Sequence, residues 1–220
     1  MLSARFRFLP ILAVALLALT LAGCRDIYEW HQKLTVTVET PLGQRSGSGI
    51  AKIVALFGRL PASSSEVEYR ITGEATVVEM SPGQYLFALL DEGSKELAAA
   101  TWRGELPTGR HHWLPRIPDL KGPKDVPQAR YPMLVTFTDL GNPKTVRRLN
   151  PADLAATFGP GYALKGITLE ITDEPVTVGA VESVLGWLHD PTYRTPPVWP
   201  SLTQLQQDTL SGMVVQGRRL

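Results

Sequence analysis

The histidines are the side chains of this sequence best suited to acid–base or metal chemistry, and two of them, His111 and His112, are adjacent. Neutral imidazole is a common metal ligand, and carboxylates that could complete a site follow at Asp119 and Asp125. Neighbouring residues of a strand point to opposite faces, so both rings could bind one ion only from an irregular backbone. We interpret the pair as part of a solvated loop and expect neither a metal nor another cofactor.

Two tryptophans lie close to this pair in sequence, Trp102 before it and Trp113 directly after it. Exposed aromatic side chains often line sites for carbohydrates or peptides, because they combine a large apolar area with a polar edge. We therefore take Trp102, His111, His112 and Trp113 as possible contacts for a ligand or partner. The alternative for the tryptophans is a place in the hydrophobic core.

Serine chemistry is a further candidate, because Ser48 lies in the glycine-rich sequence GQRSGSG. The nucleophile elbow of many hydrolases has the spacing G-x-S-x-G, which this stretch does not have. Residues 159–166, GPGYALKG, lack the GK[ST] of a phosphate-binding loop. We assign no catalytic residue and expect a protein without enzymatic activity, with a hydrolase whose site is built from loops as the alternative.

The single cysteine, Cys24, follows a segment typical of an export signal. Arg5 and Arg7 precede an apolar run over residues 9–22, which is shorter than the roughly 20 residues that a membrane-spanning helix needs. Residues 21–24, LAGC, resemble the lipobox of bacterial lipoproteins. In that family a diacylglyceryl group is attached to the thiol and the chain is cut before the cysteine. The resemblance implies a signal peptide over residues 1–23 and lipid attachment at Cys24.

The same resemblance places the chain in the bacterial cell envelope, anchored to a membrane by its lipid. By the sorting rule of enteric lipoproteins, Arg25 in place of aspartate after the cysteine favours the outer membrane over the inner one. Without the two arginines of the signal peptide, the 22 Lys and Arg become 20, against 21 Asp and Glu. Because a nearly neutral chain has no basic field to hold DNA or RNA, we expect no nucleic acid partner.

Short alternating runs of apolar and polar residues dominate the rest of the chain, as is typical of strands with one buried face. Pro82 and Gly83 between two such runs fit a type II turn, whose second central residue has a positive φ. We predict strands over 33–40, 50–57, 66–72, 74–80, 84–90, 133–140 and 162–172, a turn-rich break over 41–49, and helices over 95–106, 150–159 and 178–190. The fold class is mainly β, an antiparallel β-sandwich or partly open barrel with a few short helices.

The domain organisation follows from these segments. We expect a membrane-proximal tether over 24–32, in which Tyr28 and Trp30 lie at the level of the lipid headgroups, and a single β-rich domain over 33–200. A proline-rich loop over 107–132 crosses that domain without helices or central strands, and a boundary between two subdomains is the alternative. Residues 201–220 form a polar tail.

Three further stretches, EWHQKLTVTVETP, DLAATFGPG and ITLEITDEPVT, resemble segments of an uncharacterised group of bacterial envelope proteins with no known activity. That resemblance transfers no site residues. We expect a membrane-anchored, noncatalytic binding or scaffolding module with a protein partner in the envelope. The alternatives are the hydrolase considered above and a lipoprotein that binds a glycan or another solute.

Overall fold

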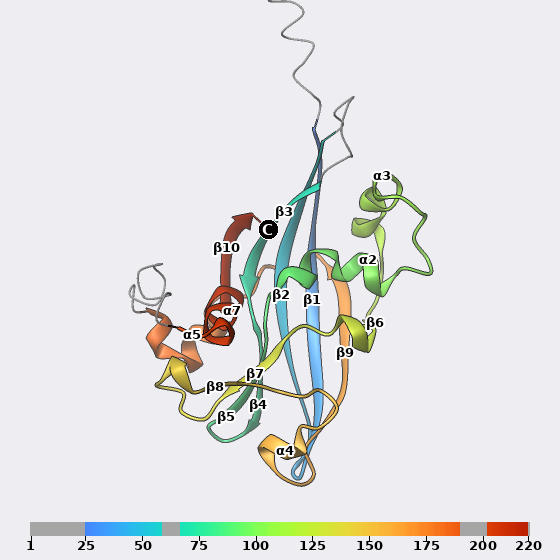
Figure 1. Cartoon of the computed structure of the whole chain (residues 1–220). Coiled ribbons are helices and arrows are strands. Elements are labelled where there is room, and N and C mark those ends of the chain that lie inside the picture. Colours follow the sequence, from blue (N-terminus) through green and yellow to red (C-terminus); the bar gives the residue numbers. More distant parts are fainter. Residues whose placement is uncertain (1–24, 59–66, 190–201, 220) are drawn as a thin grey trace, which may run out of the picture.

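The computed structural model describes residues 25–58, 67–189 and 202–219, which form two antiparallel β-sheets with short helices around them (Figure 1). In the larger sheet the strand order is β10-β3-β2-β1-β9-β6, and in the smaller one it is β4-β5-β7-β8. The mainly β fold with a few short helices is therefore confirmed, and the pair of sheets is consistent with a β-sandwich.

The elements of the described residues are as follows. The strands are β1 (Arg25–Thr40), β2 (Gly43–Gly58), β3 (Val67–Glu74), β4 (Thr76–Ser81), β5 (Gln84–Ala88), β6 (Lys124–Asp125), β7 (Leu134–Phe137), β8 (Val146–Arg148), β9 (Ala163–Thr172) and β10 (Val214–Arg219). The α-helices are α2 (Leu97–Thr101), α3 (Arg110–Trp113), α4 (Ala155–Phe158), α5 (Ala180–Val184) and α7 (Gln204–Met213). The 3₁₀ helices are η1 (Glu92–Glu96), η2 (Leu114–Asp119), η3 (Gln128–Arg130), η4 (Pro143–Thr145) and η5 (Gly186–His189). None of the helices in these three ranges is long and apolar enough to cross a membrane.

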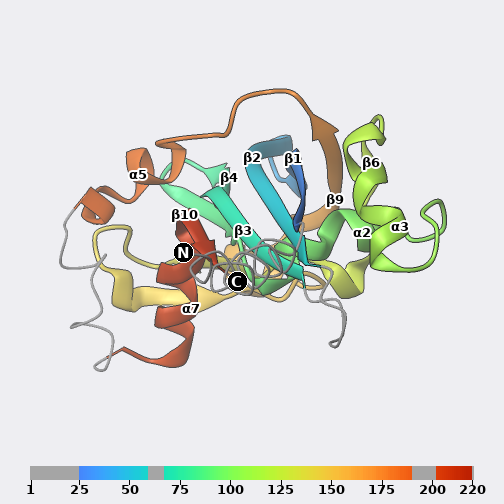
Figure 2. The same ribbon diagram turned by 90° about the horizontal axis from the view of Figure 1, so that it is seen from above.

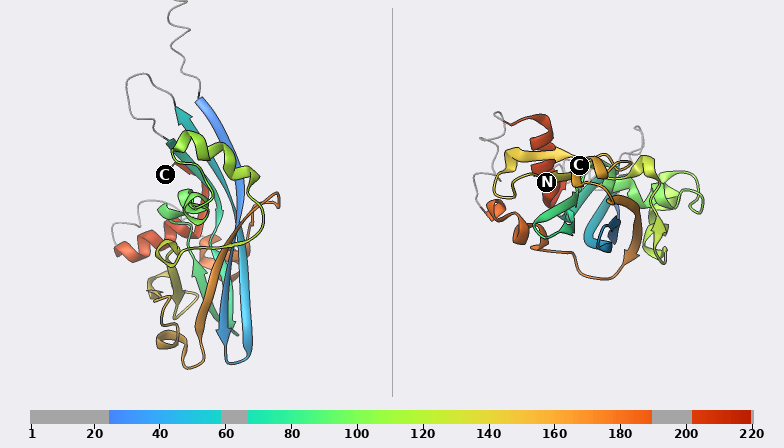
Figure 3. Two further views of the ribbon diagram at one scale, coloured as in Figure 1. Left: turned by 90° about the vertical axis from the view of Figure 1, so that its right-hand side faces the viewer. Right: turned by 90° about the horizontal axis from the view of Figure 1, so that it is seen from below.

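The hairpin of β1 and β2 lies at the centre of the larger sheet and runs the length of the molecule (Figure 3). Its register is continuous, from Thr40 opposite Gly43 to Arg25 opposite Gly58. Both strands alternate as the sequence predicts, and the inward side chains include the fully buried Val36. The two predicted strands are confirmed, and each is longer than expected.

The predicted tether over 24–32 is wrong from residue 25 onward, because those residues are the first half of β1. Trp30, expected at the headgroups, is only 4 % exposed, and its indole Nε1 donates to Oε1 of Gln32 at 3.2 Å. Gln32 in turn donates to the carbonyl oxygen of Ser94 at 2.9 Å. Pairing with β2 provides hydrogen-bond partners along one edge of this segment, and Trp30 adds a large apolar surface to the core.

Two glycines of β2 allow the smaller sheet to approach the larger one. A Cβ on Gly47 would lie 1.9 Å from the carbonyl oxygen of Val77, and one on Gly49 would lie 2.7 Å from Oγ1 of Thr76. Residues 43–49 were expected in a turn-rich break, but they are strand residues, and the turn consists of Pro41 and Leu42. Glycine is needed here for close packing of main chains, in agreement with its usual meaning inside a strand.

The proline-rich segment 107–132 contains helices, contrary to prediction: α3, η2 and η3 follow one another, and β6 pairs with β9. The prolines are tolerated because each helix is only one or two turns long. Leu114, Ile117 and Val126 are buried in the main core cluster. The segment is therefore fixed to the core at these buried positions, although most of its other residues are exposed.

The polar tail predicted for 201–220 is wrong as well. Within it, α7 begins with a capping box in which Thr203 and Gln206 bond each other's backbone N–H groups, and β10 pairs with β3. Met213 is fully buried, and its carbonyl oxygen accepts from the N–H of Ala75 at 2.8 Å. The few apolar residues of this segment are sufficient to pack it against a second cluster of buried residues, which includes Phe87, Val135 and Val181.

The remaining helices are shorter than the patterns suggest. Over 150–159, Asn150 and Asp153 accept N–H groups two and three residues ahead, and only the last turn is α-helical, as α4. Over 95–106, η1 precedes the five-residue α2. Over 178–190, the described residues form two short helices, α5 and η5. At the β4–β5 turn Gly83 has φ +77°, as the predicted turn requires.

Candidate functional site

The structure separates the four side chains that the sequence singled out. Trp102 is 2 % exposed and belongs to the core cluster, so its prediction as a ligand contact is wrong. His111 and His112 are exposed on α3, with ring centroids 3.8 Å apart. Trp113, at the end of α3, is half-buried. Trp113 lines a concave surface, together with residues of α2 and of the loop that follows it.

That concave surface is a hollow of about 410 Å³ between α2, the loop that follows it and α3, and we call it the arginine hollow. Its lining residues are Glu96, Ala99, Ala100, Arg103, Leu106, Pro107, Thr108, Gly109, Arg110, Trp113 and Arg130. The helix α3 lies toward the end of the larger sheet at which β1 begins (Figures 1 and 3). The hollow thus lies toward the end of the larger sheet at which β1 begins.

Three short elements position the lining side chains. The loop after α2 turns back because the N–H groups of Glu105 and Leu106 both donate to the carbonyl oxygen of Trp102. Gly109, with φ +89°, then starts α3, and its carbonyl oxygen accepts the N–H of Trp113 at 3.2 Å. Arg130 comes from η3, further along the chain. Buried Leu114 and Ile117 hold the end of α3 on the core.

Positive charge dominates the hollow. A guanidinium nitrogen of Arg110 donates to Oε1 of Glu96 at 2.8 Å, so these two charges largely compensate each other. Arg103 and Arg130 are exposed and form no ion pair with any other residue that the structure describes. Residues 103–130 carry six Lys and Arg against three Asp and Glu, whereas the whole chain is nearly neutral. The hollow is therefore suited to an anionic group.

A buried phenol belongs to the same neighbourhood. Tyr69, on β3, is 3 % exposed, and its hydroxyl has no hydrogen-bond partner among the described residues. Burial raises the pKa of this phenol well above its ordinary range; the charge of Glu96 raises it further and that of Arg110 opposes the shift. Tyr69 is consequently a neutral group close to the Glu96–Arg110 pair.

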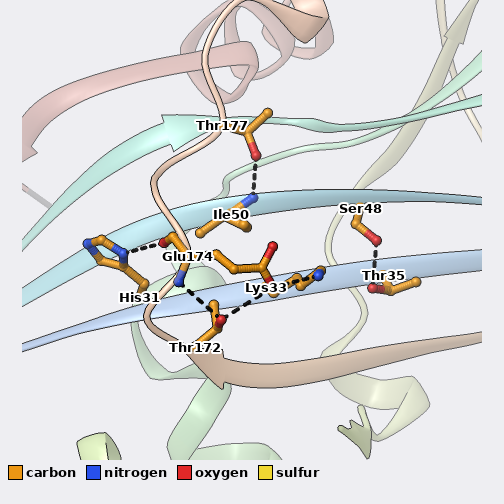
Figure 4. Close-up of polar contacts among 8 residues, drawn as sticks. All are labelled: His31, Lys33, Thr35, Ser48, Ile50, Thr172, Glu174 and Thr177. Carbon is orange, nitrogen blue, oxygen red and sulfur yellow. Dashed lines mark hydrogen bonds and ion pairs between the residues drawn. The ribbon is translucent and has the colours of Figure 1, made fainter.

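A second polar cluster lies on the outer face of the larger sheet, where residues 173–179 cross from β9 toward α5 (Figure 2). Nδ1 of His31 donates to the carbonyl oxygen of Glu174, and Nζ of Lys33 donates to its carboxylate, both at 2.7 Å (Figure 4). Thr177 binds both backbone groups of Ile50, since its Oγ1 accepts at 2.9 Å and its N–H donates at 3.1 Å. These contacts fasten the crossing segment to the sheet.

The crossing segment also ends on a buried carboxylate. Glu74 is 3 % exposed and accepts the N–H groups of Gly179, Ala180 and Val181 at 3.1, 3.0 and 3.3 Å. Such a set of donors satisfies the charge inside the protein. Both clusters are therefore already internally bonded, whereas Arg103 and Arg130 of the arginine hollow have no ion-pair partner among the described residues.

The described residues contain no group of three or more His, Cys, Asp and Glu that could hold a metal ion. Cys24 and the rest of the lipobox lie outside the residues that the structure describes. Sequence reasoning missed the arginines, although the local excess of basic residues over 103–130 was a usable signal. Comparison of the chain with protein-family models, with curated proteins and with solved structures found no match.

Proposed function

We propose that this protein is a noncatalytic binding module of the bacterial envelope, anchored to a membrane through lipid on Cys24, and that the arginine hollow is its binding site. The observation that carries the binding role is a pair of exposed arginines, Arg103 and Arg130, around a half-buried tryptophan; neither arginine forms an ion pair with a residue of 25–58, 67–189 or 202–219. Arg and Trp are the residues that most often dominate binding energy in protein interfaces.

The start of β1 supports a site close to the membrane. Because β1 begins at Arg25, the folded domain starts at the residue after the proposed anchor. Two or three acyl chains, at about 0.8 kcal/mol per buried CH₂, would give stable attachment. Helix α3, which lines part of the hollow, lies toward the same end of the sheet (Figure 1), so the partner would be another component near the membrane. We propose a protein partner and, from Arg25, the outer membrane.

Intact mass spectrometry of the protein purified from membranes tests the anchor. We expect a chain that begins at Cys24 and carries a diacylglyceryl group, with or without an acyl chain on its amine. Cys24→Ser should yield an unprocessed, unacylated precursor. A wild-type protein that starts at another residue, or that starts at Cys24 with a free thiol, would rule out the lipoprotein role.

Affinity purification from solubilised membranes tests the binding role. The wild-type chain should retain a protein that the variant Arg103→Ala with Arg130→Ala does not retain. The matched control is Arg116→Ala with Lys121→Ala, which removes two exposed positive charges outside the hollow from the same segment. Equal retention by all three chains would show that the hollow is not the binding site.

A further inference from the structure

We propose that the arginine hollow binds an acidic segment of a partner protein, in which carboxylates contact Arg103 and Arg130 and an apolar side chain packs on Leu106 and Trp113. This inference rests on the binding role proposed above and gives the chemistry of its ligand. It concerns the hollow alone, so it stands or falls independently of the lipid on Cys24.

The charged side chains of the hollow favour a ligand whose carboxylates lie next to Arg103 and Arg130. Arg110 is already bonded to Glu96, whereas Arg103 and Arg130 have no ion-pair partner in the described part of the chain, so their guanidinium groups can bind an external ligand. A guanidinium offers parallel N–H donors that match the two oxygens of a carboxylate. Glu96 repels an anion that approaches its own side of the hollow, so the ligand's charge is directed to the two remaining arginines.

The uncharged part of the lining points to a peptide. Ala99, Ala100, Leu106, Pro107 and the half-buried Trp113 provide an apolar wall beside the arginines. A simple anion would leave this wall in water, whereas an acidic segment with one leucine or aromatic residue would cover it. Charge complementarity and apolar contact together therefore favour a protein segment over a small anion.

The test uses full-length protein purified in neutral detergent and the peptide acetyl-EDLED-amide, extended before the amide by a lysine that carries fluorescein on its side chain, as in every peptide compared here. Fluorescence anisotropy should show binding that weakens with added salt. Arg103→Ala with Arg130→Ala should weaken binding about tenfold or more, because two charge-assisted contacts are lost. The control Arg116→Ala with Lys121→Ala should change binding about twofold at most, as expected for distant exposed charges.

Three further comparisons separate the contributions of the carboxylates, the apolar contact and the paired guanidinium donors to the affinity. The amide peptide acetyl-QNLQN-amide should not bind, which assigns the interaction to the carboxylates. The peptide acetyl-EDSED-amide should bind more weakly than acetyl-EDLED-amide, which assigns the rest to the apolar wall. Arg103→Lys with Arg130→Lys keeps the charge but loses the paired donors, and should give an intermediate affinity.

Three outcomes would overturn the proposal. The first is equal weakening by the hollow variant and its control, which would reduce the effect to general charge. The second is no peptide binding by a wild-type protein whose circular dichroism shows the β fold. The third is displacement of the peptide by dihexanoylphosphatidylglycerol at lower concentrations than by unlabelled peptide, which would make the hollow a lipid-headgroup site.

Discussion

The α-carbon of Gly47 lies so close to the main chain of Val77 that a methyl group on it would be 1.9 Å from the carbonyl oxygen. This contact joins β2 of the larger sheet to β4 of the smaller one. Gly47→Ala should lower the free energy of unfolding by about 3 kcal/mol, because the two strands must move apart.

Gly166→Ala is the matched control for this change. Gly166 is also a strand residue, on β9, but nothing lies within 4 Å of its Cβ position. Its substitution should alter the free energy of unfolding by no more than about 0.5 kcal/mol. Denaturant titration measures both variants, and equal destabilisation would contradict the close approach of the two sheets.

Trp102 and Trp113 should respond in opposite ways to truncation. Trp102→Ala should cost about 4 kcal/mol of stability, because the indole is buried in the core. Trp113→Ala should cost much less stability, since this side chain is half-exposed, but it should weaken binding of acetyl-EDLED-amide. Thermal unfolding and anisotropy give the two readouts; weaker binding with Trp102→Phe, at unchanged stability, would contradict the assignment of Trp102 to the core.

Glu74 should contribute much more to the stability of the fold than the exposed carboxylate of Glu92 does. Glu74→Ala leaves three backbone N–H groups without their acceptor and should cost about 3 kcal/mol. Glu92→Ala is the control, since its pair with Lys95 is exposed and worth about 0.5 kcal/mol. Hydrogen exchange should also show faster exchange at residues 179–181 in the Glu74 variant, and unchanged exchange there would count against this anchoring role.

The pair of Lys33 and Glu174 should make stability depend on pH. The hydrogen bond from Lys33 lowers the pKa of Glu174 below its ordinary 4.5, and the same bond raises the pKa of Lys33 above its ordinary 10.5. The carboxylate therefore stabilises the fold above pH 4.5, and this contribution is lost as the pH falls through its lowered pKa. The ammonium stabilises the fold below pH 10.5, and that contribution is lost as the pH rises through its raised pKa.

Glu174→Gln should remove this part of the pH profile. Between pH 6 and pH 3 the variant should lose less stability than the wild type, because it lacks the carboxylate whose pKa the bond from Lys33 lowers. Urea titrations at a series of pH values provide the measurement. Superimposable curves for the wild type and Glu174→Gln would show that the Lys33–Glu174 pair contributes nothing to the pH dependence of stability.

The proline-rich segment should resist proteolysis in spite of its composition. Leu114, Ile117 and Val126 anchor it in the core, and the N–H of Val126 donates to the carbonyl oxygen of Ile167 at 2.9 Å. Limited digestion should leave residues 107–132 uncut under conditions in which the folded protein survives. Early cleavage there into two stable fragments would instead support the alternative of two subdomains.

The features that the sequence predicted are those determined by nearby residues. The alternation in β9 and the Pro82–Gly83 turn are examples, since each depends on a few consecutive positions. The tether and the tail were mispredicted because their partners are remote: Trp30 packs on a distant core, and Val214 pairs with Glu74. Local composition cannot show such pairing.

The candidate site was predictable only in part, for the same reason. Trp113 was identified by its residue type. Trp102, which precedes it in the same part of the sequence, is also a tryptophan but is buried in the core. Arg103 and Arg130 line one hollow only because η3 returns the chain to α2. A count of charges could have indicated the segment, but only the fold brings these two arginines to one surface.

The position of β1 between β2 and β9 has a consequence for the order of folding. The hairpin with β2 is local and can form within microseconds of the chain's release. The other edge of β1 stays open until residues 163–172 arrive, and the edge of β3 stays open until β10 arrives. Two strand edges are therefore exposed while most of the chain is still unstructured, and they can pair with other chains. A protein of this topology should refold slowly and aggregate at high concentration, and in the cell it should depend on chaperones that bind extended segments.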